Sequence, residues 1–336
     1  MKRERAWAYA AFAVVCVVWG TTYLGIRIAL ESLPPLLLTG SRFVVAGLIM
    51  LAISVLRGDA IPRDRRTLAN LALVGFLMVG VGNLAVVWAE QWVPSGIAAL
   101  LVATAPFWMA IIEMFRKGGE RLTLRSGAGM AIGFIGVALL VTPRGSGGAW
   151  GVPFLLGALA IQIGGMCWQL GSAHGKYNLR DVPLMASSAL QMLFGGLIVT
   201  IVGLAIGEGP RFAFTPRTFA AMAYLTLFGS VLAYSAYVFA LAHMSTTHTS
   251  LYAYVNPVVA VFLGWLILSE PLTPLSVVAM IVILAGVALV QSAGWGKHNP
   301  NPERGRVGGG SEGSTEPQLD RQPPARIEMS DPAEAP

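Results

Sequence analysis

The sequence predicts an all-α polytopic membrane protein of ten transmembrane helices, built as two inverted five-helix repeats. Three observations support this prediction: an apolar composition, ten apolar runs of span length, and a similarity between the two halves. The chain has 336 residues, of which 55% are hydrophobic and only 12% are charged, whereas soluble domains carry about 25% charged residues. So little charge cannot cover a surface in water, which excludes most soluble enzymes and makes the lipid bilayer the expected solvent.

A helix needs about 20 apolar residues to cross the hydrocarbon layer of a bilayer. The apolar runs are continuous and do not alternate, which favours helices over a barrel. The first run reaches Ile26 without a small-residue cleavage site, so we interpret it as a retained helix rather than a signal peptide. The predicted spans are residues 8–26, 36–56, 68–89, 95–115, 127–142, 152–172, 184–206, 218–241, 247–268 and 274–292.

The basic residues predict the orientation. When the joints are assigned alternately to two sides, most Lys and Arg of the first half fall on the side of the N-terminus, whereas Arg27 and Arg144 fall on the other. Cytoplasmic loops carry such an excess. We therefore expect both termini to be cytoplasmic, in a cell (inner) membrane, and we expect the net charge of +6 to reflect orientation rather than a nucleic-acid partner.

From residue 293 the composition changes to Pro, Gly, Ser and charges of both signs. Such a segment cannot bury enough apolar surface to fold. We expect three parts: a first repeat over residues 1–143, a second over residues 147–292, and a disordered cytoplasmic tail over residues 293–336.

The similarity between the halves is the most informative pattern. Glu120-Arg-Leu-Thr and Glu270-Pro-Leu-Thr both lead into helices, which end in Gly136-Val-Ala-Leu and Gly286-Val-Ala-Leu. Further matching pairs, separated by almost the same interval, are Trp19 with Trp168, Pro34 with Pro183, Arg42 with Gln191, Asn83 with Tyr234, and Pro106 with Pro257.

A unit with an odd number of spans ends on the side opposite to its start, so a second copy must insert upside down. Inverted repeats of this kind are typical of alternating-access carriers, whose solute site lies where the halves meet. The pattern therefore predicts a small-molecule solute as the partner.

Several motifs then resemble one family. They are Trp19-Gly-Thr-Thr-Tyr-Leu-Gly-Ile-Arg, Pro34-Pro35 and Arg42-Phe, followed by Trp88-Ala-Glu-Gln-Trp-Val-Pro-Ser-Gly and Ala105-Pro106. Together they resemble an EamA-type permease of the drug/metabolite transporter superfamily, over residues 8–292. The resemblance implies a ten-helix permease for efflux of amino acids or related metabolites and leaves the substrate open.

Arg42 is the most informative polar residue, because charged groups inside a span are costly and usually face a cavity or a partner. It could bind the carboxylate of a solute, or it could extend its head to the interface as a structural residue. Its repeat partner Gln191 is also polar, which favours an inward direction.

Other polar and aromatic residues lie within the spans. Asn83 and Glu90 are seven apart and share a helical face, and we expect Glu90 to lie at the interface. The candidate cavity residues are Trp19, Tyr23, Arg42, Asn83, Trp168, Gln191, Tyr234, Tyr237, Tyr252 and Asn256.

Pro106 and Pro257 are candidate hinges, since each removes a backbone donor; a merely packed bend is the alternative. Gly129 and Gly133 form a G-x-x-x-G pattern that favours close helix packing, either within the chain or in a homodimer. Cys16 and Cys167 lie inside spans, so we expect neither a disulfide nor a metal site.

No carboxylate lies at a mid-membrane position, so proton antiport through a first-helix glutamate is unsupported, and uniport or exchange stays open. We expect no cofactor. The alternatives to a carrier are a non-transporting membrane sensor and a membrane-embedded lipid-modifying enzyme. The sequence has no H-E-x-x-H motif to favour a metal-dependent enzyme, and no G-x-x-x-x-G-K-[ST] motif to favour a nucleotide-driven pump.

Overall fold

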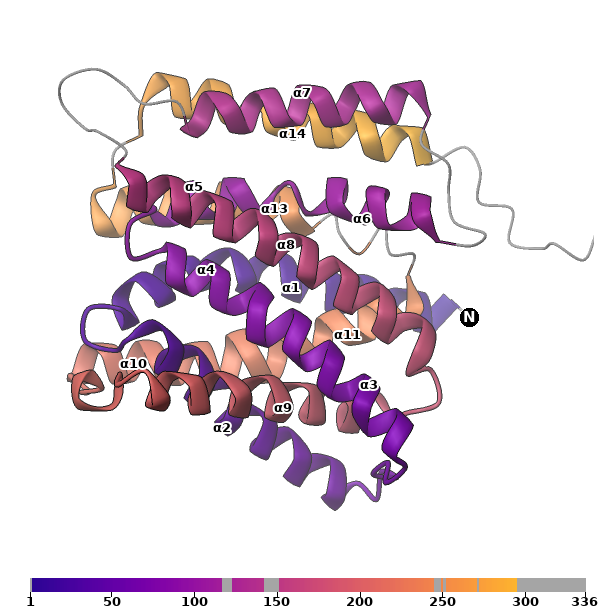
Figure 1. Cartoon of the computed structure of the whole chain (residues 1–336). Helices are drawn as coiled ribbons and strands as arrows, with labels where there is room; N and C mark the ends of the chain where they lie inside the picture. Colours follow the sequence, from indigo (N-terminus) through magenta and orange to yellow (C-terminus); the bar gives the residue numbers. More distant parts are fainter. Residues whose placement is uncertain are drawn as a thin grey trace, which may run out of the picture. The chain divides into compact units, whose positions relative to one another are not determined.

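The computed structural model describes residues 2–116, 123–141, 151–244, 249, 252–270 and 272–294. Residues 1–296 form one compact unit, and its described part contains helices and no strand (Figure 1). The predicted tail, apart from residues 293 and 294, lies outside the described residues, as do Glu120 and Arg144.

Helices occupy the predicted spans of the first half. They are α1 (Lys2–Ala29), α2 (Pro35–Leu56), α3 (Arg65–Gly75), η1 (Phe76–Asn83), α4 (Leu84–Ala89), α5 (Ser95–Val102), α6 (Ala105–Phe115) and α7 (Leu124–Val141). The second half contains α8 (Val152–Asn178), α9 (Leu184–Ala205), η2 (Gly209–Arg211), α10 (Pro216–Tyr224), η3 (Leu225–Leu232), α11 (Ala233–His243), α13 (Tyr252–Leu268) and α14 (Pro274–Gly294).

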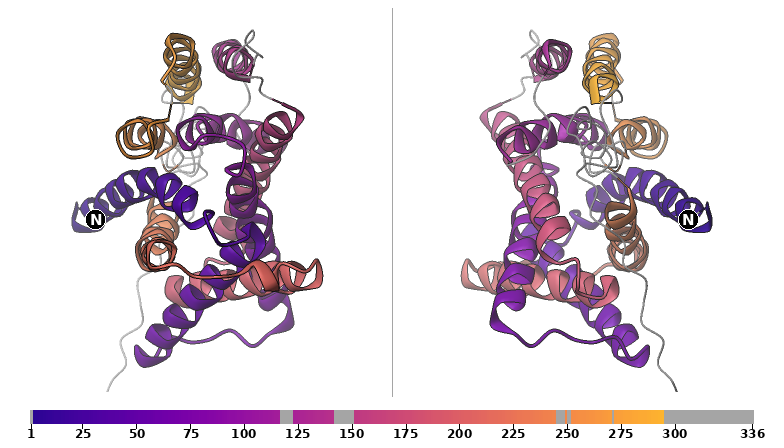
Figure 2. Two further views of the ribbon diagram at one scale, coloured as in Figure 1. Left: turned by 90° about the vertical axis from the view of Figure 1, so that its left-hand side faces the viewer. Right: turned by 90° about the vertical axis from the view of Figure 1, so that its right-hand side faces the viewer.

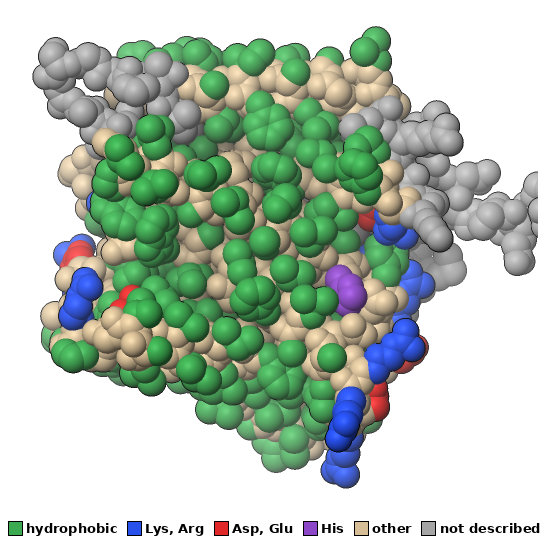
Figure 3. Space-filling model, in the orientation of Figure 1, with side chains coloured by type: hydrophobic (Ala, Val, Ile, Leu, Met, Phe, Trp, Pro, Cys, Tyr) green, Lys and Arg blue, Asp and Glu red, His purple; other side chains and the backbone are tan. Residues whose placement is uncertain are grey.

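In the part of the chain that the structure describes, seven helical segments are long and apolar enough to cross a membrane, and three shorter apolar helices cover residues 124–139, 255–268 and 274–290. Large apolar side chains remain exposed along their outer faces, and the visible face is green over most of its area (Figure 3). Exposed apolar faces of this extent require lipid. The chain is therefore a polytopic, all-helical membrane protein.

Two spans contain a π-helical segment, η1 in the middle of α3–α4 and η3 in the middle of α10–α11. Such segments widen the helix and often occur at functional sites. Their occurrence in corresponding spans of both halves is a feature that hydropathy alone does not predict.

Helices pack mainly with helices of the other half (Figures 1 and 2). The most extensive pairs are α2 with α9 and α7 with α14. In addition α1 packs with α11 and α13, while α8 packs with η1, α4, α5 and α6.

Small residues permit the α7–α14 contact. A Cβ on Gly286 would lie 2.5 Å from the Gly133 nitrogen and 2.6 Å from the Gly129 carbonyl oxygen. The G-x-x-x-G pattern is therefore used within the chain, in agreement with one of the two expected partners.

Acidic side chains from distant loops cap two helices. Glu208 accepts hydrogen bonds from the backbone N–H groups of Leu36 (3.3 Å) and Leu37 (2.8 Å) at the start of α2. Glu270 accepts from Ser95 N (2.9 Å) and Gly96 N (3.2 Å) at the start of α5. Both carboxylates therefore satisfy donors that a helix start leaves unpaired.

Lys and Arg side chains gather at one end of the unit, where α1 begins and where α6 and α8 end (Figures 1 and 3). We call this end the basic end. We call the other end, where α1 and α4 finish, the opposite end.

Candidate functional site: a cavity lined by both halves

A cavity of about 80 Å³ lies among α1, α2, η1, α8 and α13. We call it the central cavity. Its volume is below the roughly 300–1,000 Å³ of pockets for drug-sized ligands, so it suits a small solute. Seven of the predicted residues line it: Trp19, Tyr23, Arg42, Asn83, Trp168, Tyr252 and Asn256.

Arg42 is 2% exposed, and its Nε donates to the Ser230 hydroxyl at 2.8 Å. Among the described residues, no acidic oxygen lies within ion-pairing distance of its guanidinium. Gly229 makes room for the side chain, since a Cβ there would lie 3.0 Å from Arg42 Nη2. η3 thus holds a buried cation against the wall of the cavity.

Two amide side chains on the wall have polar atoms without a partner. The Asn83 Oδ1 atom is buried and accepts no hydrogen bond, and both polar atoms of Gln169 are likewise unpaired. Since buried polar groups are nearly always hydrogen-bonded, these atoms favour a bound solute or water. Sequence reasoning missed Gln169, although a polar residue inside the apolar run of α8 could have indicated it.

Asn256 is bonded within the fold. When the amide is oriented with its nitrogen toward acceptors and its oxygen toward donors, the nitrogen donates to the Cys16 carbonyl at 3.0 Å and to the Tyr252 carbonyl at 3.1 Å. It therefore joins α13 to α1 at the cavity wall.

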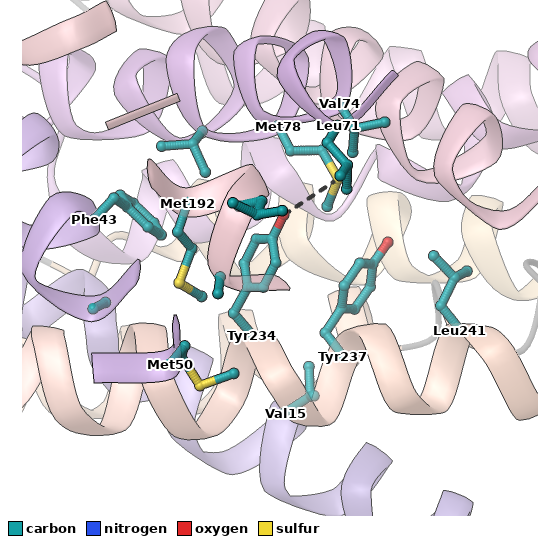
Figure 4. Packing of buried hydrophobic residues seen from close by; sticks show 14 of the residues in the cluster. Val15, Phe43, Met50, Leu71, Val74, Met78, Met192, Tyr234, Tyr237 and Leu241 are labelled. Atoms are coloured by element: carbon teal, nitrogen blue, oxygen red, sulfur yellow. Dashed lines mark hydrogen bonds between the residues drawn. The ribbon is translucent and has the colours of Figure 1, made fainter. Parts of the chain in front are cut away.

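Five aromatic residues pack against one another beside the cavity, and three of them line it. We call them the aromatic cluster: Trp19, Trp168, Tyr234, Tyr237 and Tyr252. Trp19 lies 5.1 Å from Tyr237 and from Tyr252 between ring centroids, and Trp168 lies 5.7 Å from Tyr237. The rings are closely packed, as aromatic pairs prefer. Tyr234 and Tyr237 lie in the packed core rather than on the wall (Figure 4).

A second cavity of about 370 Å³ lies beyond this cluster, with Lys176 and Arg180 on its wall. Gln191 lines this second cavity, and its Oε1 accepts from the Tyr234 hydroxyl at 2.8 Å. Gln191 and Arg42 therefore face different cavities, although the repeat predicts them to be equivalent. We call the second cavity the basic vestibule.

At the opposite end, a third hollow of about 690 Å³ is lined by Arg27, Glu31, Gln91 and Glu270 among others. We call it the outer vestibule. Glu90, which we expected at the interface, is instead fully buried, with 0% exposure. Glu90 directly follows the end of its span, as expected, but its side chain is covered because the loop after α4 packs under Arg27, whose guanidinium donates to the Glu90 backbone carbonyl.

The predicted hinges differ from each other. Near Pro106 the span is broken into α5 and α6, and the Leu101 carbonyl at the break accepts from Gln162 Nε2 at 3.0 Å. Pro257 lies inside the continuous helix α13. Neither observation tests movement, so both residues stay hinge predictions.

A family model described as "EamA-like transporter family" matches the chain twice, over residues 6–142 and 155–292. The chain is 39% identical over 285 residues to "Uncharacterized inner membrane transporter YedA" of Escherichia coli (strain K12), with 84% of this chain and 90% of the relative covered.

A further relative is described as a "Probable terminal-alkyne amino-acid exporter" of Streptantibioticus cattleyicolor; it is 27% identical over 307 residues, with 88% of this chain and 97% of the relative covered. A solved structure described as "Crystal structure of protein" matches with a TM-score of 0.65 at 20% identity, over 85% of this chain and 96% of that chain. This likeness shows the fold alone.

Proposed function

Because the chain belongs to the EamA-like transporter family, we propose that it is a secondary transporter that exports small metabolites, amino acids in particular, by alternating access. Its ten helices form two inverted five-helix repeats, with both termini in the cytoplasm. A relative whose description names amino-acid export supports this choice of solute.

Three features support the inverted repeat. The family model matches each half once. The two π-helical segments lie in corresponding spans. The contacts between halves are also reciprocal, since α1 packs with α13 as α8 packs with α5. Reciprocal contacts are what a twofold axis between equivalent units produces.

The buried, unpaired guanidinium of Arg42 at the central cavity is the observation that supports the function best. A buried charge is stable only when it is paired and hydrogen-bonded, and Ser230 satisfies one of its donors. A solute carboxylate would supply the missing charge through hydrogen bonds that are stronger than neutral ones.

The remaining wall suits the ammonium group of an amino acid. Asn83 Oδ1 and Gln169 Oε1 are free acceptors, and the faces of Trp19 and Trp168 attract cations. Carboxylate and ammonium would therefore bind to different helices, α2 on one side and η1 with α8 on the other.

Alternating access would use the two barriers that enclose the cavity. The aromatic cluster separates the central cavity from the basic vestibule. Within the cluster, the Tyr237 hydroxyl is hydrogen-bonded at 2.8 Å to the hydroxyl of Ser172, one turn after Trp168 on α8. On the other side of the central cavity, a layer that contains Tyr23 and Arg27 separates this cavity from the outer vestibule.

Counterflow into proteoliposomes tests the proposal. Purified protein would be loaded with each unlabelled amino acid, and exchange with the labelled form would be compared with that of amines and sugars that lack a carboxylate. We expect saturable exchange for at least one amino acid and none in protein-free liposomes. Absence of exchange across the whole panel, with protein that elutes as one species and unfolds cooperatively, would overturn the proposal.

A further inference from the structure

Glu90 is a buried acid without a partner. It is 0% exposed, and neither of its carboxyl oxygens has a hydrogen-bond partner. The other two buried carboxyl groups among the described residues are satisfied: Glu113 pairs with Arg116 at 2.8 Å, and Glu208 accepts from Leu36 and Leu37. Among these three buried carboxyl groups, Glu90 alone therefore lacks a hydrogen-bond or ion-pair partner.

The nearest guanidinium is engaged elsewhere. Arg27 donates to the backbone carbonyl of Glu90 and so caps the end of α4 instead of pairing with the carboxyl group. The other charged or titratable groups in electrostatic range are Tyr23 on α1, Arg42 on α2 and Glu270 after α13. On the α8 side, Gly157 packs on Ala89 and adds no charge.

Glu90 lies between two hollows. Tyr23 and Val86, each one helical turn earlier on its helix than Arg27 and Glu90, line the central cavity. Arg27 and Gln91 line the outer vestibule. The Glu90 side chain therefore belongs to the layer that closes the central cavity toward the opposite end.

A carboxylate in this layer would lack both water and donors. Burial raises the pKa of Glu90, which is the first residue beyond α4, well above its ordinary value. Burial without donors disfavours the charged form of an acid, so the closed layer holds Glu90 as a neutral acid.

We propose that Glu90 is a protonation switch for solute release, which binds a proton while the layer is closed and gives it to water in the outer vestibule when the layer opens. The inference rests on the proposed function, because the released solute is the one held by Arg42. The resulting carboxylate is attracted to Arg27 and Arg42, so it competes with the solute carboxylate and favours its departure. Closure then requires that Glu90 take up a proton from the same vestibule.

The direction of the pH dependence of opening follows from the charge of Glu90. Alkaline pH removes the proton and favours the open layer, whereas acid pH favours the closed layer. Because opening is a movement of the protein itself, it can be measured without a solute.

Electron-electron double resonance would measure this opening. Spin labels would be placed at Glu31→Cys and Ser269→Cys, which both line the outer vestibule, after replacement of the two native cysteines by serine. We expect the longer-distance population to grow as the pH rises from about 5 to about 9, the range in which a raised carboxyl pKa titrates. Glu90→Gln should abolish this response and keep the short distance at every pH.

The matched control is Glu208→Gln, since Glu208 is a buried glutamate at the same end whose oxygens are bonded to backbone N–H groups. It should keep the pH response. A response that survives in Glu90→Gln, or a native protein whose distances do not change with pH, would overturn the inference.

If the Glu90→Gln variant does not fold, a second measurement on the native protein tests the inference. Infrared difference spectra of the native protein between acid and alkaline pH should contain the band of a protonated, non-hydrogen-bonded carboxylic acid, and its absence would overturn the inference. Neither the distance measurement nor the infrared measurement needs a transported solute. A failed amino-acid panel with an intact pH response would therefore refute the proposed function and leave the pH-dependent opening through Glu90 standing.

Discussion

The indole rings of Trp19 and Trp168 meet edge to face, with centroids 5.5 Å apart and planes at 84°. The repeat predicts these residues to be equivalent, one on each half. Both N–H groups are satisfied, Trp19 by the Gly229 carbonyl at 3.0 Å and Trp168 by the Tyr237 hydroxyl at 3.3 Å. The two halves therefore touch directly through one matching pair of side chains at the wall of the central cavity.

Arg42→Ala should lower the apparent affinity for carboxylate solutes. Hydrogen bonds to charged groups contribute about 1.5–3 kcal/mol, so we expect a loss of about ten- to one-hundredfold in counterflow measurements. Arg42→Lys should restore binding only in part, because an ammonium group cannot bind a carboxylate through a planar fork.

The matched control is Arg217→Ala, since Arg217 is exposed and pairs with Glu31 at 3.2 Å. It should exchange solute like the native protein. Undiminished carboxylate exchange by Arg42→Ala would show that the arginine has a structural role only.

Gly229→Ala should weaken solute binding through Arg42. The added methyl group would lie 2.9 Å from Thr22 Cγ2 and 3.0 Å from Arg42 Nη2, so the guanidinium must move away from its present position. We expect the apparent affinity to fall by about tenfold, the effect of about 1.4 kcal/mol. Gly127→Ala, whose methyl group would meet nothing within 4 Å, is the control, and equal exchange by both variants would contradict the prediction.

Gly286→Leu should separate α7 from α14. The backbone of Gly129 and Gly133 approaches Gly286 so closely that a larger side chain has no space, and overpacking typically costs about 1–3 kcal/mol. Thermal unfolding in detergent should therefore begin at a lower temperature than for Gly127→Leu. An unchanged transition would show that the helix pair contributes little to stability.

Asp64 should make the stability of the first half fall as the pH is lowered into the acid range in which its carboxylate becomes protonated. Its carboxylate accepts the Thr67 N–H at 2.8 Å as the N-cap of α3, and this bond holds the pKa of Asp64 below its usual 3.8. A lowered pKa in the folded state stabilises the protein above the unfolded value and loses that effect as the pH falls through the folded value. The difference in unfolding midpoint between the native protein and Asp64→Asn should therefore vanish in strong acid; a difference that persists there would contradict the assignment.

Hydropathy predicted the spans well because lipid exposure imposes a single requirement on length and composition. The ends shifted by a few residues, as for α3, which begins at Arg65 rather than at residue 68. The π-helical segments were not predictable, since an apolar run has the same composition whichever backbone hydrogen bonds it forms. The break between α5 and α6 lies beside Pro106, where the missing backbone donor had predicted a hinge or a bend. The ten-span count and the inverted orientation stay predictions.

The positions of the candidate residues around the cavities were predicted in part, whereas their roles in solute binding stay predictions. Arg42 and Asn83 line the cavity as expected because a polar group in a span needs a polar surrounding. Gln191 faces the other cavity, and Glu90 is buried. Both differences come from tertiary packing, through Tyr234 in one case and Arg27 in the other, and a position along a helix does not encode such neighbours.

The capping of α5 by Glu270 has a consequence for biogenesis. The two residues that form this cap are 175 positions apart in the chain, so α5 emerges from the ribosome long before its acceptor exists. Contacts between such distant positions slow folding. Until Glu270 has been synthesised, the start of α5 therefore lacks this cap and must satisfy its N–H groups in another way.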